Sequence, residues 1–203
     1  MTISIKPAIE YINERVSEHT NKSPLIVSID GRSAAGKSTF ARLLQSGTDF
    51  PVIHTDDFCR PRDNNGVLNI SMYEGNFDIQ RFKKEVVDNL KLSYFTYGVF
   101  DCSKGIIAEM KEVTSAKCLI VEGAYSHHPL LGDYADIKLF FDIDPITQRK
   151  RILLRNIETN AENFKNIWIP AEERYFSHYG IIEKSHFIIV AQSEDNNGNI
   201  QLY

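Results

Sequence analysis

Residues Gly31 to Thr39 read Gly-Arg-Ser-Ala-Ala-Gly-Lys-Ser-Thr and complete the pattern G-x-x-x-x-G-K-[ST]. In this pattern the glycines let successive backbone N–H groups face phosphate oxygens, while the lysine reaches the outer phosphates and the serine hydroxyl ligates Mg²⁺. An apolar run, Leu25–Ile29, stands directly before the pattern, and the helix expected after it points its positive end at the same phosphates. The sequence therefore predicts a site for ATP and Mg²⁺. Its expected nucleotide contacts are Gly31, Ser33, Ala34, Ala35, Gly36, Lys37, Ser38 and Thr39.

Carboxylates follow two further apolar runs, Asp56 and Asp57 after the first and Glu122 after the second. A carboxylate at the carboxyl end of a parallel strand faces the ligand crevice. We therefore expect Asp56 to take the proton of an attacking hydroxyl, and Asp56, Glu122 and Ser38 to surround the metal. An alternative is that the paired aspartates cap a helix or lie in a surface loop.

Basic residues gather on an expected helix that follows Asp144. Arg151 and Arg155 are four positions apart and so share one face of that helix. Two planar guanidinium groups suit a phosphate, and we expect both, together with Lys37, to offset charge during transfer. Residues 148–168 would form a lid that brings these arginines to the site, and 156–166 is polar and helix-poor. The alternative is an ordinary solvated helix face.

Apolar spacing predicts the elements that must position these groups. Expected helices are Ala8–His19, Thr39–Gln45, Asp78–Leu92, Thr147–Glu158 and Ala171–His178; expected strands are Leu25–Asp30, Val52–Thr55, Cys118–Val121, Ile137–Phe141 and Phe187–Val190. Strands that alternate with helices after a phosphate loop predict an α/β fold, a three-layer sandwich with a doubly wound parallel sheet. A long loop, Arg60–Gly75, would face the substrate, and a polar surface hairpin is expected over Ser193–Asn199.

One domain is expected over residues 1–203, with an N-terminal capping helix in 1–22 and a small β-hairpin inserted within 93–112. A chain of 203 residues with 42% hydrophobic content can bury a core. The net charge of −4 gives no electrostatic footprint for nucleic acid. Short apolar stretches predict no membrane span, and an N-terminus without a signal pattern predicts a cytoplasmic protein. We expect its partner to be a small-molecule substrate. Homo-oligomer formation is left open.

Three cysteines, Cys59, Cys102 and Cys118, are too few and too scattered for a disulfide framework or a zinc site. We expect them to be reduced. His127 and His128 follow the Glu-Gly pair, and we expect them at the surface, with a role in substrate binding as the alternative.

The chain resembles the uridine kinase and phosphoribulokinase group of P-loop kinases over Leu25 to Val190. Besides the phosphate loop, the segments that carry the resemblance are Asp56-Asp57-Phe58, Asn76-Phe77-Asp78, Phe100-Asp101, Val121-Glu122-Gly123, Phe141-Asp142-Ile143-Asp144 with Arg151 and Arg155, and Ile169-Pro170-Ala171-Glu172-Glu173. This resemblance implies ATP-dependent transfer of a phosphoryl group to the 5′-hydroxyl of a ribonucleoside, with uridine or cytidine as the first expectation. It implies that Asp56 is the catalytic base and that Asp78 binds ribose hydroxyls. The expected substrate-facing residues are Asp56, Phe58, Phe77, Asp78, Phe100 and Arg149.

Two departures from the family pattern leave the acceptor open. The stretch Cys102–Gly105 has no histidine where uridine kinases read the base, and Gln148 replaces an arginine at the head of the lid helix. The segment His54–Phe58 is also similar to nicotinamide riboside kinases. Pantothenate or another small alcohol is a further alternative, as is a P-loop switch or nucleoside sensor without turnover.

Overall fold

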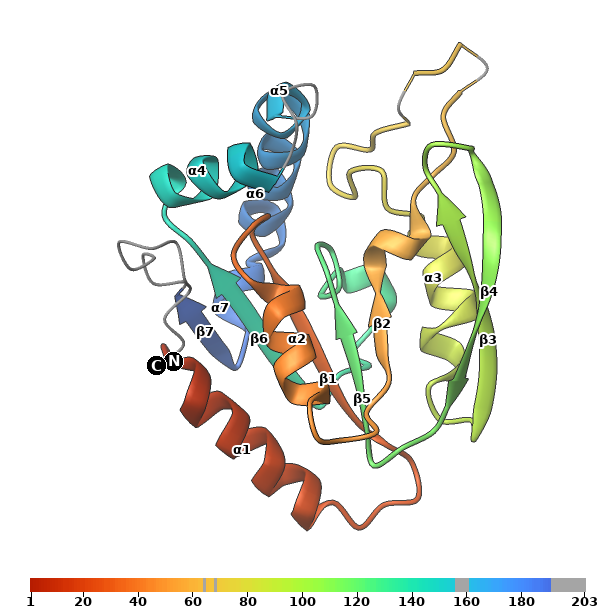
Figure 1. The fold of residues 1–203 in the computed structure, drawn as a ribbon, viewed down its shortest axis with the longest axis vertical. Helices are drawn as coiled ribbons and strands as arrows, with labels where there is room; N and C mark the ends of the chain where they lie inside the picture. The colour runs from red at the N-terminus through yellow and green to blue at the C-terminus, as the bar shows by residue number, and fades with distance from the viewer. Residues whose placement is uncertain (64, 68, 156–160, 191–203) are drawn as a thin grey trace.

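Five parallel strands form the central sheet of the chain (Figure 1). The computed structural model describes residues 1–63, 65–67, 69–155 and 161–190. In sheet order the strands are β2 (Val52–His54), β5 (Cys118–Glu122), β1 (Leu25–Gly31), β6 (Ile137–Asp142) and β7 (Phe187–Val190). The chain leaves β1, forms β2 at the edge and later inserts β5 between them, so the sheet is doubly wound as the sequence predicts. This arrangement gathers the carboxyl ends of β1, β2 and β5 at one edge.

Each face of the sheet is covered by its own hydrophobic core. Helices α1 (Ile5–Glu18) and α2 (Lys37–Gln45) cover one face, where Ile12 and Phe40 meet Val27 and Leu139. Helices α3 (Ile79–Glu85), α6 (Ile169–Tyr179) and α7 (Ile181–Lys184) contribute to the core of the other face. β1 is buried along its whole length because residues that alternate along it enter opposite cores.

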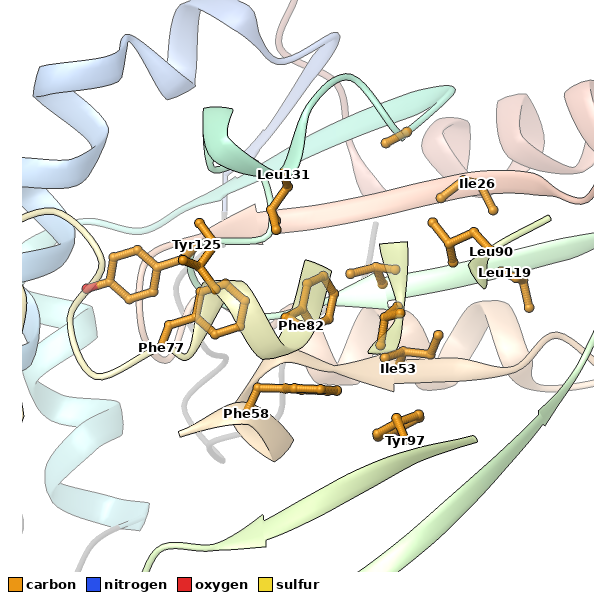
Figure 2. Close-up of a cluster of buried hydrophobic side chains, with 14 of the residues drawn as sticks. Ile26, Ile53, Phe58, Phe77, Phe82, Leu90, Tyr97, Leu119, Tyr125 and Leu131 are labelled. Atoms are coloured by element: carbon orange, nitrogen blue, oxygen red, sulfur yellow. The ribbon is translucent and has the colours of Figure 1, made fainter. Parts of the chain in front are cut away.

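A two-stranded antiparallel hairpin, β3 (Tyr94–Asp101) and β4 (Ile106–Thr114), lies outside the main sheet, beside its β2 edge in Figure 1. The Asp101 side chain shapes its turn, because Oδ1 accepts hydrogen bonds from Ser103 N (2.9 Å) and Lys104 N (3.1 Å). Tyr97 reaches from β3 into the core, where its ring stacks on that of Phe58, as Figure 2 shows. The predicted inserted hairpin is therefore present, and its second strand extends beyond the expected range.

The expected single helix over Asp78–Leu92 is wrong in its length. Helix α3 ends at Glu85, and a 3₁₀ turn, η2 (Val87–Asn89), follows it. The Asn89 amide donates hydrogen bonds to the carbonyl oxygens of Lys84 (2.9 Å) and Glu85 (3.0 Å). These bonds satisfy carbonyls that a longer helix would have used, and the helix stops there.

The predicted lid corresponds to several helices rather than an irregular loop. Helix α4 (Pro145–Arg155) is followed, after five residues outside the described part of the chain, by α5 (Ala161–Asn163), the π-helical turn η4 (Phe164–Trp168) and α6. The expectation that 156–166 is helix-poor is therefore wrong for 161–166. Phe164 and Trp168 lie four positions apart in this segment, and both line the cavity described below.

Two remaining 3₁₀ turns complete the described elements, η1 (Thr55–Phe58) after β2 and η3 (Pro129–Leu131) after β5. The hairpin expected over Ser193–Asn199 lies outside the described residues. Within the residues that the structure describes, no helix combines the length and apolar character that crossing a membrane requires.

Candidate active site

The phosphate loop joins β1 to α2, as the sequence predicts. Gly31 has φ 137°, and a Cβ built there would lie 2.2 Å from the carbonyl oxygen of Phe141, so only glycine fits. Gly36 has φ 104° and open space where a Cβ would stand. The Lys37 ammonium donates to the carbonyl oxygens of Gly31 (2.7 Å) and Arg32 (3.0 Å). The loop therefore combines a helix N-terminus, an open inner side and a cation, and these features fit the phosphates of a nucleotide.

Helices α4 and α6 hold this loop from the outside. The Glu172 carboxylate accepts hydrogen bonds from Ser33 N (3.0 Å) and Ser33 Oγ (2.5 Å). From α4, Gln148 Nε2 donates to the Ser33 carbonyl (3.0 Å) and Arg151 Nη1 donates to the Ala34 carbonyl (3.2 Å). Gln148, which departs from the family pattern, thus still makes a polar contact to the loop. Arg151 is only 3% exposed and is not among the residues that line the cavity described below, so its predicted role in offsetting charge stays a prediction.

A second set of charged contacts lies beside the first. The Arg32 guanidinium makes two hydrogen bonds to Glu173, at 2.7 and 3.0 Å, and also pairs with Asp142. Burial opposes the charge of Arg32, but these two carboxylates raise its pKa and keep it protonated. The sequence comparison with the kinase group singled out Glu172 and Glu173, but their contacts to the loop were not predicted.

Glu122 lies at the end of β5, directly between the loop and β2. Its Oε1 lies 2.5 Å from His54 Nδ1, and Ser38 and Lys37 are also among its electrostatic partners. Burial alone would raise the pKa of Glu122, but the His54 hydrogen bond and these neighbours lower it. An ionised carboxylate beside a serine hydroxyl fits the donor set that Mg²⁺ takes next to phosphates. Among the described residues, no group of three or more His, Cys, Asp and Glu side chains is arranged to hold a metal ion by itself. A metal here would therefore depend on the Ser38 hydroxyl and on phosphate oxygens as further ligands.

Asp56 lies on η1 and projects into the cavity, where solvent reaches it although protein atoms surround it. Desolvation by burial and the charge of Glu122 raise the pKa of Asp56. The adjacent Asp57 turns away, since its Oδ2 accepts from Tyr97 Oη (3.1 Å) and Lys111 Nζ (2.9 Å) on the hairpin. Of the paired aspartates, only Asp56 is therefore available to a substrate.

Arg81 positions η1, although no sequence pattern singled it out. Its guanidinium donates to the carbonyl oxygens of Asp57 (2.7 Å) and Gly98 (2.7 Å), and it lies 4.3 Å from the centre of the Phe58 ring. One side chain of α3 thereby fixes both η1 and strand β3. Its signal in the sequence is only its position three residues after Asp78, the residue that caps α3.

A cavity of about 700 Å³ connects these groups. Its lining comes from the phosphate loop, η1, the end of β5, the hairpin turn and the lid helices. Six of the predicted loop residues and four other predicted site residues line it: Ser33, Ala34, Gly36, Lys37, Ser38 and Thr39, with Asp56, Phe58, Phe77 and Glu122. Arg62 brings the predicted substrate-side loop into the lining, and lining residues that were not predicted as site residues include Asn76, Tyr125, Phe164, Trp168 and Glu172.

Several predicted substrate residues lie elsewhere. Asp78 caps α3, where its Oδ1 accepts from Arg81 N at 3.1 Å, and it does not line the cavity. Phe100 pairs with Ile107 within the hairpin, and Arg149 is exposed on α4. The side chain of Arg155 lies outside the described part of the chain.

The expectation of two surface histidines is wrong. His128 is fully buried and its ring stacks on Tyr175, and His127 is half-buried. The Asp30 carboxylate holds the segment after β5 and α6 together, because its Oδ2 accepts hydrogen bonds from His127 N (3.0 Å) and Tyr175 Oη (2.8 Å). A buried carboxylate behind the loop requires such donors, and they draw the segment after β5 inward.

No family model matches the chain. Among curated proteins, it is 28% identical over 160 residues to the pantothenate kinase of Enterococcus faecalis, covering 68% of this chain and 51% of that protein. It is 24% identical over 216 residues to the pantothenate kinase of Vibrio vulnificus, covering 92% of this chain and 67% of that protein. The chain thus spans about half to two thirds of the length of these relatives.

Solved structures match over almost the whole chain. A protein described as a possible uridine kinase from Bacillus stearothermophilus superposes with a TM-score of 0.65 at 18% identity, covering 91% of this chain and 98% of that one. The chain has the fold of the uridine kinase-type P-loop kinases. D-glycerate 3-kinase from Cryptococcus neoformans var. grubii shares this fold, with a TM-score of 0.68, 15% identity and 97% of both chains covered. Proteins with this P-loop kinase fold therefore carry names of different acceptors, and the fold alone does not name the one used here.

Proposed function

We propose that this protein is an ATP- and Mg²⁺-dependent kinase that transfers the γ-phosphoryl group to a hydroxyl of a small alcohol. One observation carries the proposal: Asp56 shares a single cavity with Lys37 of the phosphate loop and with Glu122. Phosphoryl transfer needs a phosphate cradle, a metal position and a base for the attacking hydroxyl. The three parts come from the ends of adjacent strands, as expected for a doubly wound sheet.

The donor side is formed by the loop and Glu122. Backbone N–H groups of the loop bind phosphate oxygens, and Lys37 exchanges its carbonyl contacts for the outer phosphates. Ser38 and Glu122 would hold Mg²⁺, which would supply positive charge to the phosphate oxygens. Arg151, which contacts the Ala34 carbonyl, adds positive charge behind the loop. The role predicted for Arg155 stays a prediction, because its side chain lies outside the described part of the chain.

The acceptor side is formed around Asp56. Its carboxylate accepts the proton of the attacking hydroxyl, and Lys37 and Arg151 offset the charge that spreads over the transferred group. A raised pKa makes Asp56 a stronger base than an ordinary carboxylate. Glu122, whose pKa is lowered, stays ionised beside it. Two nearby carboxylates are thus suited to two different roles.

The acceptor is a small alcohol, and two classes have support. Pantothenate is the first candidate, because the curated relatives carry that name and because the Arg62 side chain in the cavity lining can pair with a carboxylate. A ribonucleoside such as uridine or cytidine is the second, since the half-buried rings of Phe164 and Trp168 in the cavity lining offer aromatic surface to a base. Asp78, the predicted ribose contact of this second candidate, uses its Oδ1 to cap α3, so its role with a ribose stays a prediction.

ADP release tests the proposal directly. The full chain is incubated with ATP and Mg²⁺ plus pantothenate, uridine, cytidine, nicotinamide riboside or D-glycerate, or buffer alone, and the product is identified by mass. Turnover that depends on one acceptor supports the kinase and names its substrate. Equal ADP release in buffer would instead favour a nucleotide-hydrolysing switch, and nucleotide binding without turnover would favour a sensor.

A further inference from the structure

Two thiols, those of Cys59 and Cys102, meet at the acceptor end of the cavity. Cys59 directly follows η1, and Cys102 lies in the turn between β3 and β4. Both side chains line the cavity, and the Cys59 thiol interacts directly with that of Cys102. Both are free, with Cys59 half-buried and Cys102 exposed.

The contacts around η1 explain why residues 43 positions apart in the chain are neighbours. Arg81 bridges the backbones of Asp57 and Gly98, and the Tyr97 ring stacks on Phe58 with ring centres 5.2 Å apart. Lys111, on the second strand of the hairpin, pairs with the Asp57 carboxylate at 2.9 Å. These contacts hold the hairpin against η1, and so they keep the hairpin turn that carries Cys102 beside the segment that carries Cys59.

We propose that Cys59 and Cys102 are an oxidisable thiol pair whose disulfide ties the hairpin turn to the segment that carries Asp56. The Cys59 thiol donates a hydrogen bond to the Asp56 carbonyl oxygen at 3.4 Å. A disulfide has no S–H, so oxidation removes this contact next to the proposed base. It also joins two walls of the cavity where the acceptor must enter.

A peroxide supplies the oxidising equivalents. The Cys102 sulfur attacks one peroxide oxygen, the O–O bond breaks, and a sulfenic acid and one water form. The Cys59 sulfur then attacks the Cys102 sulfur, so the S–S bond forms, the S–O bond breaks and a second water leaves with the Cys59 proton. Exposure makes Cys102 the first to react. Burial and the neighbouring Cys102 raise the pKa of the Cys59 thiol, so Cys59 is the less reactive of the two thiols and does not attack the peroxide first.

The first test reads the crosslink itself and does not depend on enzymatic activity. The full reduced chain is treated with hydrogen peroxide at low protein concentration, free thiols are alkylated, and peptides are mapped by mass spectrometry. We expect an intramolecular Cys59–Cys102 peptide that disappears after dithiothreitol. The same peptide is expected in Cys118→Ser, because Cys118 is fully buried on β5 away from the cavity, and none in Cys102→Ser.

The second test reads the consequence and rests on the proposed kinase activity. For each protein, acceptor-dependent turnover after peroxide is divided by its own turnover in the reduced state. We expect this ratio to fall at least about tenfold for the natural sequence and for Cys118→Ser, and to recover with dithiothreitol. It should stay near one in Cys102→Ser, whatever the reduced turnover of that variant.

Three results would overturn the proposal: both thiols still alkylated after peroxide, a Cys102 oxidised to the sulfinic acid without a crosslink, or a crosslink that joins two chains. If the crosslink forms but acceptor-dependent turnover does not change, the proposed effect of the disulfide on the acceptor end of the cavity is wrong. If no acceptor supports turnover at all, the peptide map still decides whether the pair forms.

Discussion

The Glu172 carboxylate accepts hydrogen bonds from both the backbone N–H and the hydroxyl of Ser33, at 3.0 and 2.5 Å. An acid of the helix that follows the lid thus binds the backbone of the phosphate loop. Glu172 is only 4% exposed, and Gln148 binds the carbonyl of the same loop residue. The shape of the loop is therefore set by helices α4 and α6 as well as by its own glycines.

Removing the Glu172 carboxylate should weaken nucleotide binding. In Glu172→Ala the Ser33 N–H and hydroxyl lose their acceptor, and the loop no longer arrives in its binding shape. We expect the Kd for ATP to rise about tenfold to a hundredfold, the equivalent of one or two hydrogen bonds to a charged group. Glu172→Gln keeps an acceptor oxygen and should stay within about threefold of the natural protein. Equal affinities for all three proteins, measured by calorimetry, would contradict a role of Glu172 in shaping the loop.

Glu172 should also make stability depend on pH. Burial raises its pKa above the ordinary value of 4.5, so above pH 4.5 the folded state holds this proton more tightly than the unfolded state does. The contribution of Glu172 to the free energy of unfolding must then fall as pH rises from 4.5 through the raised pKa. Denaturant unfolding of the natural protein and Glu172→Gln should give a difference that shifts in favour of the glutamine variant between about pH 4.5 and 7. A constant difference over that range would show that Glu172 titrates normally.

Gly31→Ala should be among the most damaging single changes in the loop. The added Cβ would lie 2.2 Å from the Phe141 carbonyl oxygen, at φ 137°. We expect a loss of at least about 3 kcal/mol in the free energy of unfolding, because backbone atoms of β6 cannot move aside. Gly47→Ala is the matched control, since Gly47 has φ 82° and open space, and should lose only about 1 kcal/mol. If both variants unfold at the same denaturant concentration, the close approach of Gly31 to the β6 backbone does not explain why glycine is required there.

Asp78 offers a test of capping against substrate binding. Asp78→Ala should lower the free energy of unfolding by about 0.5–2 kcal/mol, because the Arg81 N–H loses its cap. Asp78→Asn keeps an oxygen acceptor and should retain that stability. If the acceptor KM is also unchanged in Asp78→Asn, Asp78 acts as a cap. A large rise in KM without loss of stability would restore the ribose contact that the family resemblance implies.

The strands and the phosphate loop could be predicted because their signals are local. Leu25–Gly31 is apolar, β-branched and followed by a loop whose residue types are dictated by phosphate chemistry. Asp56 and Glu122 could be predicted because each follows an apolar run, and because parallel strands bring their carboxyl ends together. Their place in the cavity follows from topology rather than from side-chain packing.

The remaining site residues depend on contacts between distant segments. Glu172 meets Ser33 across 139 positions of the chain, and Arg81 joins three elements through backbone carbonyls. His128 is buried with its ring stacked on Tyr175, whose hydroxyl bonds to Asp30 behind the loop, and no local pattern reveals this arrangement. The lid is helical through 161–168 although its composition is polar, and no local pattern places Phe164 and Trp168 in the cavity lining.

Acceptor-dependent ADP formation by the natural protein and by Asp56→Asn is the most direct measurement of the central claim. It is made at saturating ATP and Mg²⁺ with the acceptor that the panel identifies, and nucleotide affinity is measured alongside. We expect turnover to fall at least about a hundredfold in Asp56→Asn, while the Kd for ATP stays within about threefold. Turnover that survives the substitution, or ADP formation that never depends on an acceptor, would contradict the assignment of Asp56 as the base of a small-alcohol kinase.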